Sequence, residues 1–294
     1  MNLIDPQIAA LESGRAFVDL STWRKVQVRG RDASAWLNDL LSAELTGLAG
    51  GSARRSLLLS PTGRVRADVS VLAGEDGLLL LQDPEQDASI GEALEPYVLS
   101  SDVTIEDATD LVGLLAFPGS APPPEGALGN RASPSVLGEG VDILPPPSKL
   151  REAGDAARAA RLTEAGPEAV EIWRIRRGRP RVGVDLGQDA LPHEAVMDHL
   201  IGYGKGCFLG QEAVAKVRNL GHPPFLLLAA TASTPLSPGD PVRSRGSDAG
   251  VVTSAAPLGN ADWAAILRVR WAFRKAELET TDGGRLEVRG PAAA

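Results

Sequence analysis

The stretch KGCFLGQE, residues 205–212, is the most specific segment of this chain. It holds Cys207, the only cysteine of the 294 residues, two positions after Lys205. Gln211 and Glu212 open a run of helix formers, where their side chains suit the first turn of a helix. A helix N-terminus and a nearby ammonium group both favour the thiolate, the reactive form of cysteine. The pattern predicts a functional thiol at Cys207, with Lys205 as a second catalytic residue that lowers the pKa of the thiol. The competing interpretation is a buried cysteine in a turn.

Three glycines, Gly204, Gly206 and Gly210, surround this thiol. Glycine adopts backbone conformations that other residues avoid, and it lets another molecule approach the main chain. The glycines therefore allow unusual backbone in this loop and the approach of another molecule to its main chain.

Further segments carry patterns that accompany the octapeptide. The stretch RIRRGRP is followed by GVD and LPHE, and two weaker motifs, VRGRDASAWL and LLSPTGR, lie nearer the N-terminus. Their positions are 174–180, 183–185, 191–194, 28–37 and 58–64. Together with KGCFLGQE, they resemble the motifs of the YgfZ-type folate-binding proteins, which are relatives of the glycine-cleavage T-protein, an aminomethyltransferase.

The resemblance implies an α+β fold. It is a T-protein-like cloverleaf of two interleaved α+β units with a small C-terminal β-barrel and tetrahydrofolate in a central channel. The folate-binding region would span residues 1–222, with its second unit at roughly 52–150, and the barrel would span residues 223–294.

The same resemblance implies a set of side chains that bind tetrahydrofolate or a one-carbon derivative of it. A pterin edge needs a polar partner, and a glutamate tail needs cations. The cofactor-binding candidates are Arg174 and Arg177 for the tail, Asp185 and Glu194 for the channel, and Gln211 and Glu212 beside the thiol. The alternative for the two channel carboxylates is a helix-cap or turn role. Trp36, Trp173, Tyr203 and Phe208 are candidates for the channel walls.

Composition excludes several classes of protein. The net charge of −8 gives no broad basic field, so we do not expect nucleic acid as a partner, although residues 174–181 are locally basic. One cysteine excludes an internal disulfide, and no apolar run is long enough to cross a bilayer. Three histidines without a close partner argue against a metal site built by this chain. We expect a cytoplasmic monomer.

Periodicity and turn residues give a coarse secondary structure. The alternation at residues 65–72 and the apolar run at 78–81 predict an antiparallel hairpin. Proline and glycine clusters predict that residues 117–148 are loop with a strand or two, and short β-type runs after residue 223 predict an all-β module. Further strands are expected at 25–28 and 56–59, and helices at 33–41, 84–98, 165–177 and 211–219.

The predicted function is a tetrahydrofolate-binding factor that assists iron–sulfur cluster assembly or repair in client enzymes, with Cys207 as the functional thiol. Its partners would be those iron–sulfur enzymes or assembly proteins. The alternative is a folate-dependent aminomethyltransferase or methyltransferase that uses Asp87 or Asp185. The resemblance favours the accessory factor, because the folate-binding block of T-proteins, R-x-x-Y-T-G-E-x-G-x-E, survives only in part at residues 131–142. A Cys-His hydrolase built on His193, His199 or His222 and a silent folate sensor are two further alternatives.

Overall fold

The computed structural model describes residues 4–74, 77–119, 129–259 and 261–293. Contacts between Cα atoms divide the chain into two compact units. Unit 1 consists of residues 1–58, 66–170 and 204–209, and unit 2 consists of residues 59–65, 171–203 and 210–294. The octapeptide is therefore shared, with Cys207 in unit 1 and Gly210 in unit 2.

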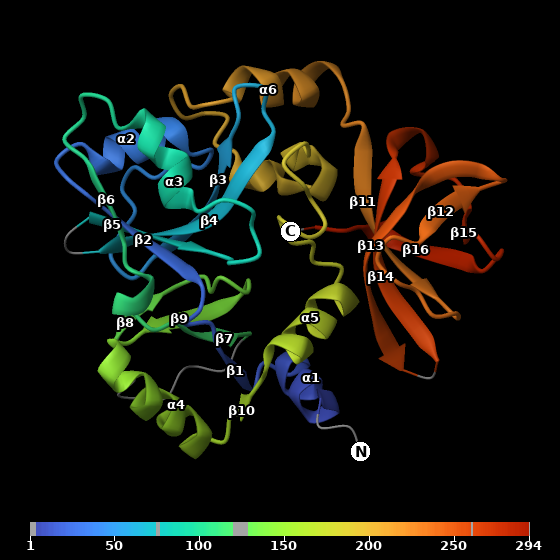
Figure 1. Ribbon diagram of the computed structural model, residues 1–294, viewed down its shortest axis with the longest axis horizontal. Coiled ribbons are helices and arrows are strands. Elements are labelled where there is room, and N and C mark those ends of the chain that lie inside the picture. Colours follow the sequence, from blue (N-terminus) through green and yellow to red (C-terminus); the bar gives the residue numbers. More distant parts are fainter. Residues whose placement is uncertain (1–3, 75–76, 120–128, 260, 294) are drawn as a thin grey trace. The chain divides into compact units, whose positions relative to one another are not determined.

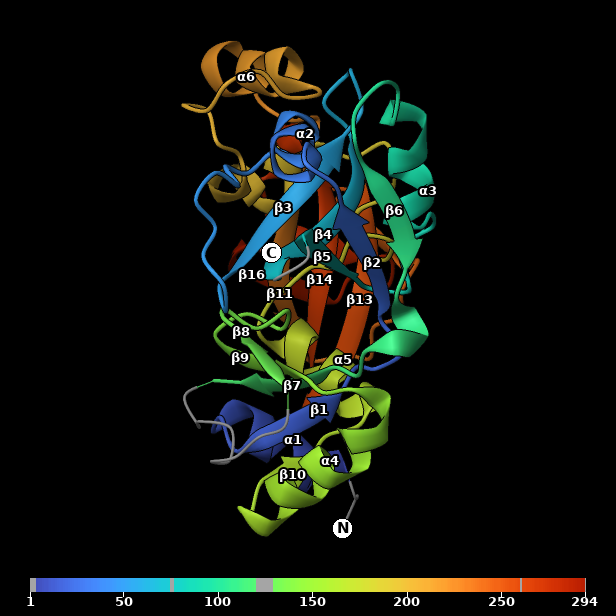
Figure 2. The same ribbon diagram turned by 90° about the vertical axis from the view of Figure 1, so that its left-hand side faces the viewer.

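Unit 1 contains two five-stranded sheets (Figures 1 and 2). The first has the order β3-β4-β5-β2-β6, in which the β4–β5, β5–β2 and β2–β6 pairs are antiparallel, and the second has the order β10-β1-β7-β9-β8. The first sheet comprises β3 (Ala53–Leu59), β4 (Val65–Gly74), β5 (Gly77–Gln82), β2 (Arg24–Arg29) and β6 (Thr104–Asp107). The second comprises β10 (Thr163–Glu164), β1 (Ala16–Asp19), β7 (Leu115–Pro118), β9 (Gly140–Leu144) and β8 (Asn130–Ala132).

Strand β5 shows how this unit is layered, because both of its faces are apolar. Leu78 and Leu80 pack in a cluster that includes residues of α2 (Ala33–Leu40) and α3 (Ile90–Leu94). Leu79 and Leu81 point the other way and pack with Leu144 of the second sheet. Successive strand side chains alternate between faces, so one leucine run holds two layers together. On the second sheet, α4 (Leu150–Ala159) packs against Phe17 and Phe117. Helix α1 (Ile4–Glu12) precedes β1.

Apart from residues 59–65, unit 2 starts within α5 (Pro167–Arg176), and it contains a closed barrel of the strands β11 to β16. Two 3-10 turns, η4 (Pro192–Ala195) and η5 (Met197–Leu200), and α6 (Gln211–Leu220) precede the barrel along the chain. The barrel order is β11-β14-β13-β12-β15-β16, and the last strand pairs with the first. Its strands are β11 (Phe225–Ala232), β12 (Pro241–Ser244), β13 (Ser247–Gly259), β14 (Asp262–Arg270), β15 (Leu278–Thr280) and β16 (Arg285–Pro291).

The α+β class and the C-terminal barrel are confirmed, whereas the helix predicted at 84–98 is wrong in its first half. Helix α3 begins only at Ile90, with Ser89 as its N-cap. Before it, the Gln82 side chain accepts the Ile90 N–H at 2.8 Å, and the Gln86 side chain bonds both main-chain groups of Asp68 at 2.8 Å. These bonds hold the segment as a turn, because side-chain amides replace the backbone bonds of a helix.

The proline-rich stretch contains the expected strands, β8 and β9. Part of it, residues 120–128, lies outside the described residues. Among the helices that the structure describes, none is long and apolar enough to cross a membrane.

Candidate functional site

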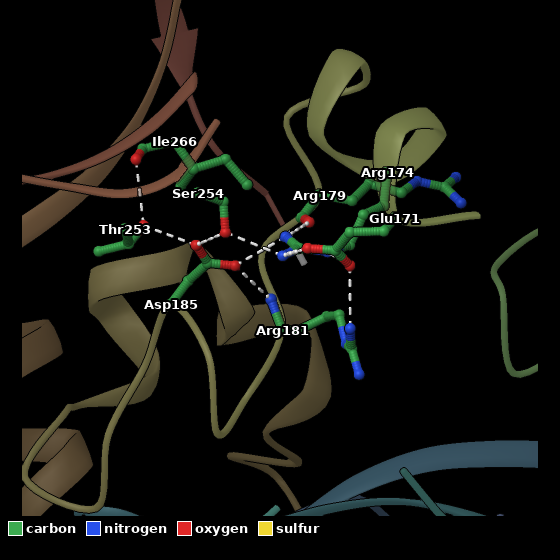
Figure 3. A network of polar contacts seen from close by, with 8 residues as sticks. All are labelled: Glu171, Arg174, Arg179, Arg181, Asp185, Thr253, Ser254 and Ile266. Carbon is green, nitrogen blue, oxygen red and sulfur yellow. Dashed lines mark hydrogen bonds and ion pairs between the residues drawn. The ribbon is translucent and has the colours of Figure 1, made fainter. Parts of the chain in front are cut away.

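Asp185 is the centre of a buried polar network in unit 2 (Figure 3). One carboxylate oxygen accepts the hydroxyls of Thr253, at 2.5 Å, and Ser254, at 2.7 Å, both on β13. The other oxygen accepts the Arg174 guanidinium at 2.8 Å and the Arg181 main-chain N–H at 2.9 Å. A buried carboxylate with four donors is fully satisfied, so Asp185 fastens the barrel to the segment that follows α5.

The hydrogen-bond donors of Arg174 are also all satisfied. Its Nε and one terminal nitrogen bind the Glu171 carboxylate at 2.7 and 2.5 Å. The remaining donors bind Asp185, the Arg179 carbonyl at 3.1 Å and the Ser254 hydroxyl at 2.8 Å. All five N–H groups of a guanidinium are thereby engaged. The geometry favours a positioning role, and direct ligand contact by Arg174 or Asp185 stays an untested prediction.

Arg177 is exposed and lies against an aromatic ring. Its guanidinium carbon is 5.4 Å from the centre of the Trp173 ring, and that of Arg179 is 5.3 Å from the same centre. The indole N–H of Trp173 is buried and has no hydrogen-bond partner. Arg177 thus presents its guanidinium to solvent, and its role in binding a glutamate tail stays a prediction.

Glu194 lies in η4 and is fully buried. One oxygen accepts the Leu191 N–H at 3.2 Å, which closes the turn, and the other accepts the Nε–H of Arg268 at 3.0 Å. Burial raises the pKa of Glu194, and the charge of Arg268 opposes that rise. The carboxylate therefore depends on one arginine of β14 for charge compensation.

Next to it in the chain, His193 belongs to a second cluster. Its Nε2 lies 3.4 Å from the Tyr203 hydroxyl and 3.5 Å from the Asp198 carboxylate. Its Nδ1 is buried and has no hydrogen-bond partner. Burial lowers the pKa of His193 and raises that of Tyr203 to about 12, so both side chains are neutral at neutral pH. Arg218 of α6 stacks on Tyr203 at 4.0 Å.

In unit 1, Cys207 is exposed, which excludes the buried-cysteine interpretation. Lys205 holds the loop by donating to the main-chain carbonyls of Asn38, Leu41, at 2.6 Å, and Ala43, at 2.8 Å. Three N–H donors thus meet three carbonyls at the end of α2. Burial lowers the pKa of Lys205 to about 8, which leaves the ammonium as the main form at neutral pH. Lys205 is a structural anchor for the loop in this structure.

The three glycines of the loop are not equivalent. Gly210 has a φ of +81° and is the N-cap of α6, whereas a Cβ on Gly204 or Gly206 would meet nothing within 4 Å. Of the three, Gly210 uses the left-handed backbone, whereas Gly204 and Gly206 do not adopt positive φ. The approach of another molecule to the main chain at these glycines stays a prediction. Gln211, half-buried, and Glu212, exposed, form the first turn of α6.

We expect Gly210→Ala to destabilise unit 2 and Gly206→Ala to be neutral. A Cβ on Gly210 would lie 2.5 Å from the Ser60 carbonyl oxygen, and positive φ adds strain. The cost should be about 2 kcal/mol of unfolding free energy, measured by urea denaturation. Equal stability of the two variants would contradict this role for Gly210.

Asp142 of β9 is a buried carboxylate in the partial T-protein block. It accepts the Ser135 hydroxyl at 2.5 Å and the Val136 N–H at 2.8 Å. Burial raises the pKa of Asp142 to about 7. This carboxylate organises its own loop, which is a structural use of the residue.

Asp142 should make stability pH-dependent. Its raised pKa means that the native state holds a proton that the unfolded chain loses near pH 4. The resulting stabilisation is complete below that pH and is lost as the pH rises towards 7. Asp142→Asn stays neutral throughout, so the variant should gain about 1–3 kcal/mol over wild type at pH 8 and less at pH 5. Urea denaturation at both pH values tests this, and a pH-independent difference would contradict it.

Comparison with known proteins agrees with this architecture. Residues 2–122 match the model of the GCVT N-terminal domain. A solved structure, aminomethyltransferase T of the glycine cleavage system from Bartonella henselae, superposes with a TM-score of 0.79 at 18% identity, over 98% of this chain and 88% of that one. The fold is therefore the T-protein fold.

Two curated relatives align over much of the chain. A candidate chloroplastic transferase of Arabidopsis thaliana is 25% identical over 278 residues, which is 85% of this chain and 64% of that protein. An aminomethyltransferase of Mycobacterium leprae is 26% identical over 239 residues, which is 72% of this chain and 65% of that protein. The chain thus spans slightly under two thirds of the length of these relatives, and the matches support the T-protein superfamily.

The partners of the buried carboxylates were not predicted from the sequence. Arg268 lies on β14 in the alternating sequence LRVR, where Leu267 and Val269 are buried in the barrel. An arginine in such a strand points to the outer face, and that alternation was the available signal. Nothing local links Arg268 to Glu194, which lies 74 residues earlier.

Proposed function

We propose that this protein is a YgfZ-type factor that binds tetrahydrofolate in unit 2. We propose further that its Cys207 thiol assists iron–sulfur cluster assembly or repair in client enzymes. The observation that carries the proposal is the exposure of Cys207 on a loop anchored by Lys205. An exposed thiol on a fixed loop can meet a macromolecular client, which a buried thiol cannot.

The side chains of unit 2 fit a reduced folate. Its pterin edge carries N–H donors beside a carbonyl oxygen, and Glu194 is a buried carboxylate with lone pairs beyond the two that accept Leu191 and Arg268. The buried Nδ1 of His193 has no partner, as expected of a group that awaits one. Exposed Arg177 suits the anionic tail. When bound, tetrahydrofolate supplies nitrogen atoms that carry one-carbon units.

The second candidate is a folate-dependent transferase, which the name of the aminomethyltransferase relative favours. Charge control at the one-carbon unit would need an available carboxylate. Asp185 already accepts four hydrogen bonds, and Asp87 is exposed. These observations support the accessory factor over the transferase. Turnover of a methylamine-type donor with tetrahydrofolate would favour the transferase.

Calorimetric titration with tetrahydrofolate tests the proposal that unit 2 binds folate. We expect micromolar binding in wild type and in Cys207→Ser, and a loss of at least about 100-fold in Glu194→Ala, since a charged hydrogen-bond partner is removed from a buried site. Cys207→Ser is the matched control, because it alters the thiol alone. No binding by wild type would reject folate as the ligand.

Genetic complementation tests the proposed role of the Cys207 thiol. In a strain that lacks this protein, wild type should restore the activity of iron–sulfur enzymes, and Cys207→Ser should restore little of it. Gly206→Ala, which alters the same loop without steric conflict, should behave as wild type. Full complementation by Cys207→Ser would contradict a role for the thiol.

A further inference from the structure

The two side chains of the Glu194–Arg268 ion pair differ in solvent exposure. The Glu194 side chain has 0% of its surface exposed, while that of Arg268 has 20%. A ligand that approaches this pair therefore meets Arg268 first. We propose that Arg268 is the specificity-determining donor of the site, and that it gives an N–H to an acceptor oxygen of the bound folate. This inference rests on the proposed folate binding.

The bonds that Arg268 already makes leave one end of its guanidinium available. Nε donates to Glu194 at 3.0 Å, and one terminal nitrogen, Nη2, lies 3.4 Å from the Asp189 carboxylate. The other terminal nitrogen, Nη1, has no hydrogen-bond partner among the described residues. A guanidinium carries five donors in a fixed plane, so with Nε and Nη2 engaged the Nη1 end of the terminal fork remains for a further acceptor.

The plane of this fork is fixed before any ligand arrives. The guanidinium carbon lies 4.3 Å from the centre of the Phe225 ring, which holds the group by a cation–π contact. Arg268 and Phe225 lie on β14 and β11, adjacent strands of the barrel. A donor held in this way loses little conformational entropy on binding, which gives the site specificity.

The chemistry of the pair selects one edge of a reduced pterin. Glu194 can accept only from donors, and the free end of Arg268 can donate only to acceptors. A 2-amino-4-oxopteridine presents N–H groups beside a carbonyl oxygen, which is the matching order of donor and acceptor. The 4-oxo oxygen is thus the acceptor that we assign to Arg268. A carboxylate of the glutamate tail offers the same chemistry from a second source.

Calorimetry with three ligands separates these sources. The ligands are tetrahydrofolate, its 4-amino analogue, and a tetrahydropterin without the tail. Each is titrated into wild type, Arg268→Met, Arg268→Lys and Arg270→Met. Arg270 is the matched control, because it lies two residues further along β14 and pairs with Asp248 at the surface.

Arg268→Met should bind tetrahydrofolate about 10- to 100-fold more weakly than wild type, the loss typical of one charge-assisted hydrogen bond. Arg270→Met should stay within about 2-fold of wild type, as surface pairs contribute little. Wild type should reject the 4-amino analogue by about 100-fold or more, because a donor then faces Arg268. Arg268→Met should lose the share of that discrimination that Arg268 supplies, about 10-fold or more, while the share due to Glu194 remains, because the analogue also lacks the N3–H that Glu194 accepts.

Each of the other outcomes contradicts a particular part of the proposal for Arg268. If Arg268→Met discriminates against the 4-amino analogue as wild type does, the 4-oxo assignment is wrong. If that variant also binds the tail-less pterin as wild type does but tetrahydrofolate more weakly, Arg268 contacts the tail instead. If it binds tetrahydrofolate as wild type does, Arg268 is no ligand contact, although the folate proposal stands. If wild type binds no tetrahydrofolate, the proposed function itself fails, and this inference with it.

Arg268→Met leaves Glu194 buried without its cation, so the variant could misfold. Arg268→Lys retains a positive charge but not the planar fork, and it should fold and still lose discrimination. Circular dichroism of every variant separates a lost contact from a lost fold. A folded Arg268→Lys with wild-type discrimination would overturn the proposal.

Discussion

Asp185→Ala should lower the free energy of unfolding by about 3 kcal/mol, because it leaves the buried Arg174 guanidinium without its buried counter-ion. It also leaves the hydroxyls of Thr253 and Ser254 without the acceptor that they share. Glu171 still pairs with Arg174, which keeps the expected cost at the lower end for a broken buried ion pair. Urea denaturation followed by circular dichroism measures the change.

The control for this prediction is Asp248→Ala in the same unit. Asp248 pairs with Arg270, and both side chains are more than half exposed, at 64% and 51%. An exposed pair of this kind is worth at most about 1 kcal/mol. If Asp185→Ala costs no more than Asp248→Ala, the network in Figure 3 does not stabilise unit 2.

Secondary structure was predicted correctly from the sequence where contacts between neighbouring residues determine it. Alternation and leucine runs predicted β4 and β5, and helix formers after a glycine predicted α6. The failure at residues 84–89 has a non-local cause, because Gln86 bonds the main chain of Asp68, 18 residues earlier. Residues 150–159 form α4, a helix that was not predicted although its alanine-rich pattern is present in the sequence.

Motif resemblance named candidate residues for the site but not the residues that they contact. Motif resemblance selected Arg174, Asp185 and Glu194, and all three are buried. Their partners Ser254 and Arg268 come from barrel strands 80 and 74 residues away. Such pairs follow from strand register, which a single sequence specifies only through the alternation of its side chains. The roles of these residues therefore depend on geometry that no motif encodes.

Unit 1 contains a second lysine of the same kind as Lys205. Lys25 is fully buried and donates to the carbonyls of Ser21, Trp23 and Thr109 at 2.6, 3.0 and 3.2 Å. Burial lowers the pKa of Lys25 as well. In both lysines the ammonium group donates to three main-chain carbonyls, but only Lys205 belongs to the loop that carries the Cys207 thiol.

Lys205→Met should destabilise unit 1 by about 2–3 kcal/mol, because the buried carbonyls of Leu41 and Ala43 lose their donor. It should also release the loop, so that a thiol reagent modifies Cys207 several-fold faster and proteolysis begins near Gly206. Lys25→Met is the matched control: it removes an equivalent anchor and should lower stability without changing the rate at Cys207. If both variants change that rate equally, Lys205 acts only through general stability. If Lys205→Met changes neither stability nor rate, the three carbonyl contacts do not hold the loop, and the fixed setting of the thiol would need another source.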